Sequence, residues 1–260
     1  MTNEISGRGD PLKTLQLLWH GITPPKRGPR PKVTLQALVN AAIAIADKDG
    51  LDAVSTRRVA EAVGISPMSF YTYVPGKAEL LDLMLDAVSG DPEKREPPAF
   101  NPTHWRANVK MVAGTLFDYY LAHPWVLEFA THRPVMGPNM LRSYESALSA
   151  FDGIGLSDLE IDRAFAALAN YVYGAVRDAA REKIVRETTG MSDDEWWGRV
   201  LPFLETIDYS PYPVTSRVGP VAGEHHGAHD PLNAFAFGLD CMLDGLELYI
   251  SRKAGRPATG

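Results

Sequence analysis

Apolar residues recur at three- and four-residue spacing along most of the chain, the period of an α-helix with one buried face. Alternating apolar and polar runs of strand length do not stand out, so the sequence predicts an all-α fold. Potential caps and Pro or Gly breaks delimit the helices of the first third. These predicted helices cover residues 12–19, 34–49, 56–63, 66–73 and 77–88.

A charged, proline-rich stretch over residues 91–102 separates this compact part from the remainder. The spacing beyond it predicts helices over residues 103–122, 137–150, 157–187, 192–207 and 231–252, with a short piece around 125–131. Residues 208–230 are rich in Pro, Gly and His and are predicted to form a loop. We therefore expect an N-terminal extension over 1–32, a small helical domain over 33–90 and a larger helical domain over 91–260.

With 260 residues, 45% of them hydrophobic, the chain can bury a sizeable core. Its single cysteine, Cys241, excludes a disulfide within one chain and is expected to be a small buried side chain. The sequence has no apolar run long enough to cross a membrane and no apolar stretch typical of a signal peptide at its start. A cytoplasmic protein is therefore expected.

Charge is distributed unevenly along the chain. The net charge is −6, yet residues 22–77 carry eight Lys and Arg against four Asp and Glu, and the chain from residue 78 onward is strongly acidic. A basic N-terminal part joined to an acidic remainder is expected when one domain meets a polyanion and the other has another task.

Two short helices joined by a turn with Gly64 are typical of a helix-turn-helix DNA-binding motif. Gly64 permits a positive φ in the turn, and apolar residues such as Val59 and Phe70 can lock the helices together. The exposed face of the second helix is then left to enter the major groove of DNA.

Residues 54–85, VSTRRVAEAVGISPMSFYTYVPGKAELLDLML, closely resemble the DNA-binding domain of the TetR family of bacterial transcriptional regulators. The resemblance rests on Thr56-Arg57, Val59-Ala60, Gly64, Phe70-Tyr71 and the Lys77 that precedes an acidic and apolar helix. With the preceding helix it covers about 55 residues, and an all-helical C-terminal remainder fits the same family.

The resemblance implies which side chains face DNA. Thr56, Arg57, Tyr71, Tyr73 and Lys77 are expected at DNA-facing positions, with Tyr71 and Lys77 on phosphates. Base edges would be faced by Ser66, Pro67, Met68, Ser69 and Thr72. Since this set has no Gln, Asn or Arg for a bidentate base contact, direct readout would rest on Ser69, Thr72 and Tyr73, with DNA shape adding to it.

The basic segment before the domain departs from the usual family pattern, which starts close to the first helix. Lys26, Arg27, Arg30 and Lys32 alternate with prolines and could form an arm in the adjacent minor groove. The alternative is a solvated linker whose charge is incidental.

The acidic C-terminal part is rich in aromatic residues, which can line an apolar cavity for a small molecule or simply fill a core. The resembled family uses this domain as an effector sensor, and the candidate ligand-binding residues are Trp105, Phe117, Tyr120, Trp125, Phe129, His132, Met140, Tyr144 and Tyr173. The apolar stripes of the two long helices predict a homodimer interface that contains Phe165, Leu168, Val172, Leu239, Met242 and Leu246.

A metal enzyme is the rival from another class, because His225, His226 and His229 lie within six residues. They lie in a predicted loop without a helix to fix their geometry, so we expect no metal site, no cofactor and no enzymatic activity. The sequence also has no GxSxG, P-loop or GxGxxG motif.

The prediction from sequence is therefore a ligand-responsive transcriptional regulator that binds a double-stranded DNA operator as a homodimer. We expect a repressor that a small hydrophobic or amphipathic effector releases from a pseudo-palindromic operator. Two alternatives stay open, namely a TetR-like activator and a helical protein that binds small molecules without binding DNA.

Overall fold

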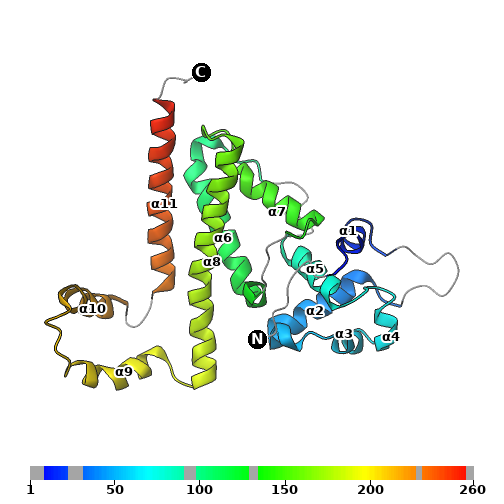
Figure 1. Ribbon diagram of the computed structural model, residues 1–260, viewed down its shortest axis with the longest axis horizontal. Helices are drawn as coiled ribbons and strands as arrows, with labels where there is room; N and C mark the ends of the chain where they lie inside the picture. The colour runs from blue at the N-terminus through cyan, green and yellow to red at the C-terminus, as the bar shows by residue number, and fades with distance from the viewer. Residues whose placement is uncertain (1–8, 23–31, 91–97, 129–133, 227–229, 256–260) are drawn as a thin grey trace. The chain divides into compact units, whose positions relative to one another are not determined.

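The computed structural model describes residues 9–22, 32–90, 98–128, 134–226 and 230–255; the side chains of 178, 181–187, 193 and 224–226 also lie outside the described part. Every regular element in these ranges is a helix, which confirms the all-α prediction (Figure 1). The chain divides into two compact units, residues 1–169 and 170–260, and the boundary falls inside the long helix α8 (Asp158–Thr189).

Five α-helices and one 3₁₀ turn form the N-terminal part of the first unit. They are α1 (Pro11–His20), α2 (Leu35–Asp49), η1 (Leu51–Ala53), α3 (Thr56–Ala62), α4 (Pro67–Phe70) and α5 (Lys77–Val88). Side-chain caps fix several helix starts, since Thr34 Oγ1 accepts the Ala37 N–H at 3.1 Å and Asp10 caps α1. Gly50, at φ 81°, ends α2 as expected for a glycine after a helix.

The helices of this part share one cluster of buried hydrophobic side chains. Leu38 of α2, Val59 of α3, Phe70 of α4 and both Leu80 and Met84 of α5 are completely buried. Each helix therefore contributes at least one side chain to the same cluster, and burial of large apolar side chains is the main source of stability here.

The rest of the first unit comprises η2 (Pro102–His104), α6 (Trp105–Ala122), η3 (Pro124–Glu128), α7 (Pro138–Ser149) and the first part of α8. The short piece predicted around 125–131 is a 3₁₀ turn over 124–128, and 129–131 lie outside the described residues. Trp125, Val126 and Val135 belong to the same buried cluster as the N-terminal helices.

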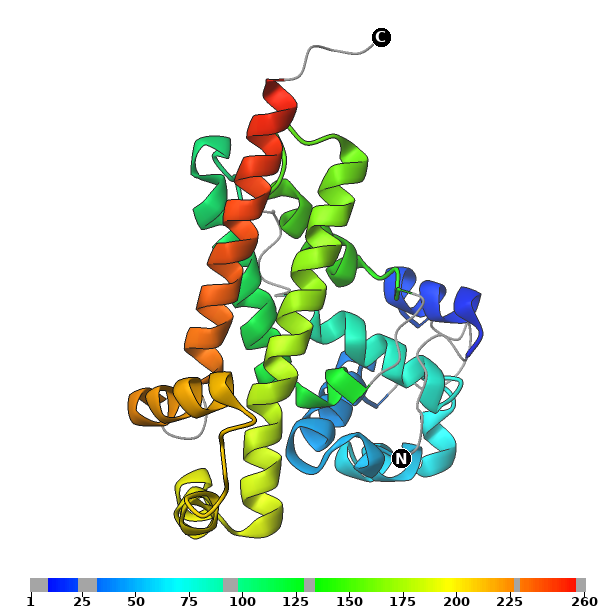
Figure 2. The same ribbon diagram turned by 60° about the vertical axis from the view of Figure 1, so that its left-hand side comes forward.

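The second unit contains the end of α8, α9 (Asp193–Leu204), α10 (Pro213–His226) and α11 (Pro231–Ala254), which Figure 2 shows from another side. Helix α10 lies where the sequence predicted a loop, so that prediction was wrong. Pro213 occupies its first turn, where no N–H is needed, and Val214, Val218 and Val221 follow at helical spacing. The Pro and Gly residues between them concealed this period.

Cys241 of α11 is exposed, which corrects the expectation that it is buried. In the described part of the chain, none of the helices combines the length and the apolar character that a membrane span requires.

Candidate nucleic-acid interface

The turn between α3 and α4 is built by caps and one glycine. Ser55 Oγ accepts the Arg58 N–H at 3.2 Å, and Ser66 Oγ accepts the Ser69 N–H at 3.1 Å. Gly64 has φ 74°, a left-handed conformation that glycine adopts without strain. Since Phe70 is fully buried, α4 is fixed to the core by its last residue, whereas Pro67 and Met68 are exposed and Ser69 is half-buried.

The exposed face of α4 and the turn after it carries one large apolar group and several hydroxyls. Met68 is 78% exposed and Tyr71 is 52% exposed. The Ser66 and Ser69 hydroxyls are 2.8 Å apart, and Thr72 Oγ1 donates to the Ser69 carbonyl at 2.7 Å. These contacts hold the small polar side chains in one arrangement beside the Met68 side chain.

Tyr71 connects the two helices of the motif at the surface. Its hydroxyl lies 3.5 Å from Thr56 Oγ1, at the first residue of α3, and its ring packs edge-on against Phe70 at 5.6 Å between centroids. The structure thus brings together two of the residues that the sequence predicted on the DNA side.

The two arginines of α3 are both paired with carboxylates. Arg57 Nε donates to Glu61 Oε1 at 2.9 Å, and this hydrogen bond and the Glu61 charge raise the pKa of Arg57. Arg58 forms an ion pair with Asp49 of α2. Because the Arg57 and Glu61 side chains are largely exposed, their ion pair is weak and can be exchanged for a stronger partner.

Tyr73 differs from its predicted position on the DNA side. Its side chain is only 7% exposed, and its hydroxyl accepts the Val33 N–H at 3.4 Å. The ring belongs to the core cluster beneath the motif, so Tyr73 is corrected from a base-reading residue to a packing residue. Sequence alone did not separate it from Tyr71, since both are tyrosines two positions apart.

The predicted arm lies mostly outside the described residues, which include Lys32 but not Lys26, Arg27 or Arg30; Lys32 is exposed just before α2. Beside the motif, a groove of about 230 Å³ separates α1 from the chain after α4. Lys13 and Gln16 line it on one side, and Tyr71 and Thr72 on the other. No sequence pattern predicted that α1 lies against these residues.

The predicted ligand-binding residues fall into separate environments. Trp125 is 1% exposed and Phe117 is 4% exposed, while Tyr120 packs against the cluster that contains Trp125. The Tyr144 hydroxyl donates to Asp162 at 2.9 Å, and hydrogen bonding to this carboxylate raises the pKa of Tyr144.

The other members of that set are spread along the chain. The Arg106 guanidinium lies over the Trp105 ring, 5.7 Å from its centroid. The Arg177 guanidinium lies over the Tyr173 ring, 5.5 Å from its centroid. Met140 is half-buried in the first turn of α7, and Phe129 and His132 lie outside the described residues.

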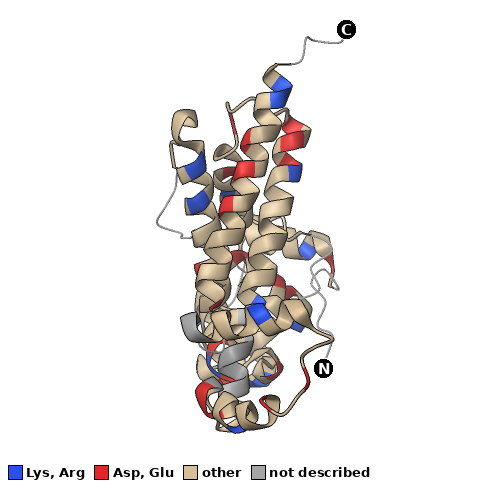
Figure 3. Ribbon diagram, turned by 90° about the vertical axis from the view of Figure 1, so that its left-hand side faces the viewer, with Lys and Arg blue, Asp and Glu red and all other residues tan. Residues whose placement is uncertain are grey.

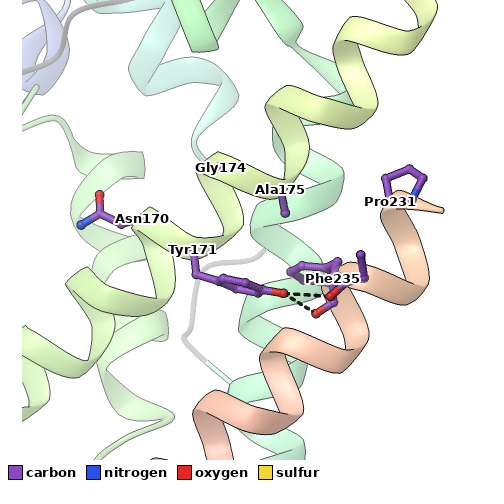
Figure 4. A pocket seen from close by; sticks show the side chains of 7 residues that line it. Asn170, Tyr171, Gly174, Ala175, Pro231 and Phe235 are labelled. Atoms are coloured by element: carbon purple, nitrogen blue, oxygen red, sulfur yellow. Dashed lines mark hydrogen bonds between the residues drawn. The ribbon is translucent and has the colours of Figure 1, made fainter. Parts of the chain in front are cut away.

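A cavity of about 450 Å³ lies in the second unit, where Tyr171 of α8 meets the start of α11 (Figure 4). The Tyr171 ring stacks on Phe235 at 5.7 Å, and its hydroxyl donates to the Phe235 carbonyl at 2.7 Å. Gly174 and Ala175 of α8 leave space beside the rings, and Asn170 also lines the cavity although its amide points away from the rings. This cavity was not predicted from the sequence, although Tyr171, Gly174 and Ala175 recur at the spacing that places them on one face of a helix.

The predicted dimer residues also differ in exposure. Leu168, Val172 and Leu239 are buried within the chain, so little of their surface is left for a partner. Phe165, Met242 and Leu246 are half-buried. On α11 the more exposed apolar side chains are Leu232, Phe237, Leu248 and Tyr249, and the helix ends in Arg252 and Lys253, the blue segment beside the C-terminus in Figure 3.

The geometry of α3, Gly64 and α4 defines a helix-turn-helix DNA-binding protein. Residues 38–84 match "Bacterial regulatory proteins, tetR family", and residues 97–250 match "Tetracyclin repressor-like, C-terminal domain". The chain therefore belongs to the TetR family of bacterial transcriptional regulators.

Individual relatives agree with this assignment. The chain is 39% identical over 258 residues to the HTH-type transcriptional repressor DrrR1 of Streptomyces coeruleorubidus, covering 99% of this chain and 93% of that protein. Apo ActR from Streptomyces coelicolor superposes with a TM-score of 0.68 at 24% identity, covering 86% of this chain and 99% of ActR. ActR in complex with actinorhodin gives a TM-score of 0.67 at 26% identity over 83% of this chain and 95% of ActR.

Proposed function

We propose that this chain is a homodimeric transcriptional repressor that a small-molecule effector releases from a pseudo-palindromic operator. The observation that carries the proposal is the exposed face of α4, where Met68 and the neighbouring hydroxyls are held on a capped, rigid helix. Repression is the activity stated for the relative DrrR1, which matches nearly the whole chain.

At the operator, α4 lies in the major groove and α3 crosses the backbone. The hydroxyls of Tyr71 and Thr56 donate hydrogen bonds to phosphates. The Arg57 guanidinium leaves Glu61 and binds a phosphate oxygen instead. Both partners of Arg57 are anionic hydrogen-bond acceptors, but the exposed Glu61 pair is weak, whereas each phosphate contact also gains from the high negative charge density of DNA. Lys77 contacts the backbone at the start of α5.

Sequence is read by the side chains of α4 and by Thr72, two residues after the helix. The Met68 side chain contacts thymine methyl groups, and the hydroxyls of Ser69 and Thr72 bond to base edges. Ser66 and Pro67 approach the bases at the helix start. Lys26, Arg27, Arg30 and Lys32 reach the neighbouring minor groove as an arm.

Two copies associate through the exposed apolar side chains of α11, among them Phe237 and Leu248, together with the half-buried Phe165, Met242 and Leu246. Such a two-fold arrangement presents two copies of α4 to successive major grooves of one DNA face, which requires an operator with inverted half-sites.

The effector binds in the cavity that Tyr171 and Phe235 line together with Gly174 and Ala175. The volume of the cavity lies in the range of small-molecule sites, and the two stacked rings suit a flat, largely apolar molecule. That ActR has been seen with actinorhodin and with (S)-DNPA supports a small-molecule effector for this chain as well.

The test first selects operator DNA from a random pool. Fluorescence anisotropy then measures whether any member of a panel of small molecules, which includes actinorhodin, releases the protein from that DNA. We expect at least one compound of the panel to release wild-type protein. Ala175→Trp fills the cavity and should retain operator affinity while release needs at least tenfold more compound, whereas Ala122→Trp at the exposed end of α6 should respond as wild type. Equal release of Ala175→Trp and wild type would place the effector elsewhere.

The sign of regulation is tested in cells with a reporter gene behind the selected operator. Expression of the protein should lower reporter output, and the releasing compound should restore it. Increased output on expression would make the protein an activator.

A further inference from the structure

The described residues of segment 123–140, which are 123–128 and 134–140, follow α6 and lead into α7, and they are held by the helices of the DNA-binding part. Trp125, Val126 and Val135 of this segment are buried in the same cluster as Leu38 and Phe70. Three helices of the DNA-binding part, α1, α2 and α5, each add a side-chain hydrogen bond to it.

Asp47, in the last turn of α2, holds the beginning of the segment. Trp125 Nε1–H donates to Asp47 Oδ1 at 2.6 Å, and His123 Nδ1 lies 2.7 Å from the same oxygen. Trp125 is 1% exposed, so its indole N–H needs a partner inside the protein, and Asp47 provides it.

Asp86 of α5 holds the end of the segment. Its Oδ1 accepts the N–H of Asn139 at 3.1 Å and of Met140 at 2.9 Å, two amides in the first turn of α7 that lack partners within their own helix. The helix has Gly137 at its N-cap, without a capping side chain, so a carboxylate from another helix takes that role. A Cβ on Gly137 would lie 2.1 Å from Asp86 Oδ1, which shows how closely the backbone at Gly137 approaches the Asp86 side chain.

Trp19 of α1 adds a further hydrogen bond to the same segment. Its Nε1–H donates to the Met136 carbonyl at 3.0 Å. The helix itself is fixed to α5, because the Asp10 N–H donates to Glu79 Oε1 at 3.1 Å and Leu17 and Leu18 pack against the core. This helix precedes residue 38, where the match to the family's DNA-binding domain begins.

We propose that Asp47, Asp86 and Trp19, the anchor residues, fix the DNA-binding helices to segment 123–140 and so set the direction in which α4 is presented to DNA. The inference rests on the proposed function, since orientation matters only if two copies of α4 must fit one operator. Each anchor is a positioning residue that acts on α4 through the core, and none contacts DNA.

A dimer with rigidly oriented α4 helices discriminates sharply between half-site spacings, because a wrong spacing forces either the protein or the DNA to deform. A dimer with loosened anchors tolerates a wrong spacing, since the helices can adjust independently. Affinity for one isolated half-site stays the same in both cases. This difference separates a positioning role from a general loss of structure.

The experiment measures binding of the full chain to its selected operator, to the same operator with one base pair added between half-sites, and to one half-site. Trp19→Phe keeps an aromatic ring but replaces the indole by a smaller phenyl group without an N–H donor, and Asp86→Asn removes the charge of the α7 anchor. Asp118→Asn, at an exposed position of α6, is the charge control.

We expect the preference of wild type for the correct spacing to fall at least fivefold in Trp19→Phe and in Asp86→Asn, with half-site affinity within twofold and Asp118→Asn unchanged. The double variant should lose less spacing preference than the losses of the two single variants added together, since both hydrogen bonds hold the same short segment. Variants that keep the wild-type spacing preference would overturn the proposal. Wild type without any spacing preference would contradict the dimeric operator itself, and would remove the positioning role with it.

Discussion

Replacing Gly64 by alanine isolates the backbone requirement of the turn between α3 and α4. Gly64 has φ 74°, and a Cβ added there meets no atom within 4 Å. The substitution therefore introduces no steric clash, and its whole effect is the conformational penalty of a left-handed L-residue, about 1–2 kcal/mol. We expect this loss in the free energy of unfolding, which corresponds to a roughly 5- to 30-fold increase in the unfolding equilibrium constant.

Gly114 in the middle of α6 is the matched control. A Cβ there also meets no atom within 4 Å, but its φ is not positive, and glycine inside a helix is less stable than alanine by roughly 0.5–1 kcal/mol. Gly114→Ala should therefore stabilise the protein, so two substitutions of the same type should have opposite signs.

The assay is urea unfolding followed by circular dichroism, with operator affinity measured on the same samples. Gly64→Ala should lower the urea midpoint, because the alanine is strained in the left-handed conformation, and it should weaken operator binding as far as the turn relieves this strain by changing the angle between α3 and α4. Gly114→Ala should raise the midpoint and leave operator affinity as in wild type. A Gly64→Ala variant as stable as wild type would refute the role assigned to the turn.

Three further predictions follow from single contacts. Ser66→Ala removes the cap on the Ser69 N–H and should cost about 1 kcal/mol in urea unfolding; an unchanged midpoint would contradict the cap. Glu61→Gln releases Arg57 from its ion pair, so operator binding measured by anisotropy should become several-fold tighter. The salt dependence of binding should become steeper by about one charge, and weaker binding would argue against a phosphate contact by Arg57. Burial raises the pKa of Asp86 above its ordinary value of 3.8, so the folded state binds that proton more tightly than the unfolded state. Stability should therefore fall as pH rises from 3.8 through the folded-state pKa, and this part of the pH dependence should vanish in Asp86→Asn; identical urea midpoint profiles against pH would refute it.

The fold could be predicted where local signals agree. Ser55, Gly64 and Ser66 mark the turn by cap and backbone chemistry that depends on a few neighbouring residues, and the structure has α3 and α4 at these positions. Helix α10 was missed for the same local reason, because Pro220 and its neighbouring glycines resemble a loop while the valines between them keep a helical period.

The candidate site was predictable only in part, because exposure depends on contacts between distant residues. Tyr71 and Tyr73 have the same chemistry and lie on one short stretch, yet Tyr71 is exposed and Tyr73 packs beneath the motif with its hydroxyl bonded to the Val33 N–H. Likewise, Trp125 has the features of a cavity-lining aromatic but is held in the core by Asp47, 78 positions away in sequence. Periodicity identifies which residues are apolar and says little about which distant helix covers them.

Recognition of a specific operator by the face of α4 is tested by selection from a random DNA pool. We expect enrichment of an inverted repeat that binds the dimer tightly, with an affinity that falls steeply as salt rises. Arg57→Ala and Tyr71→Ala should each lose most of that affinity and still bind the effector. Selection that enriches no sequence, or variants at Arg57 and Tyr71 that bind the selected DNA as wild type does, would contradict the account.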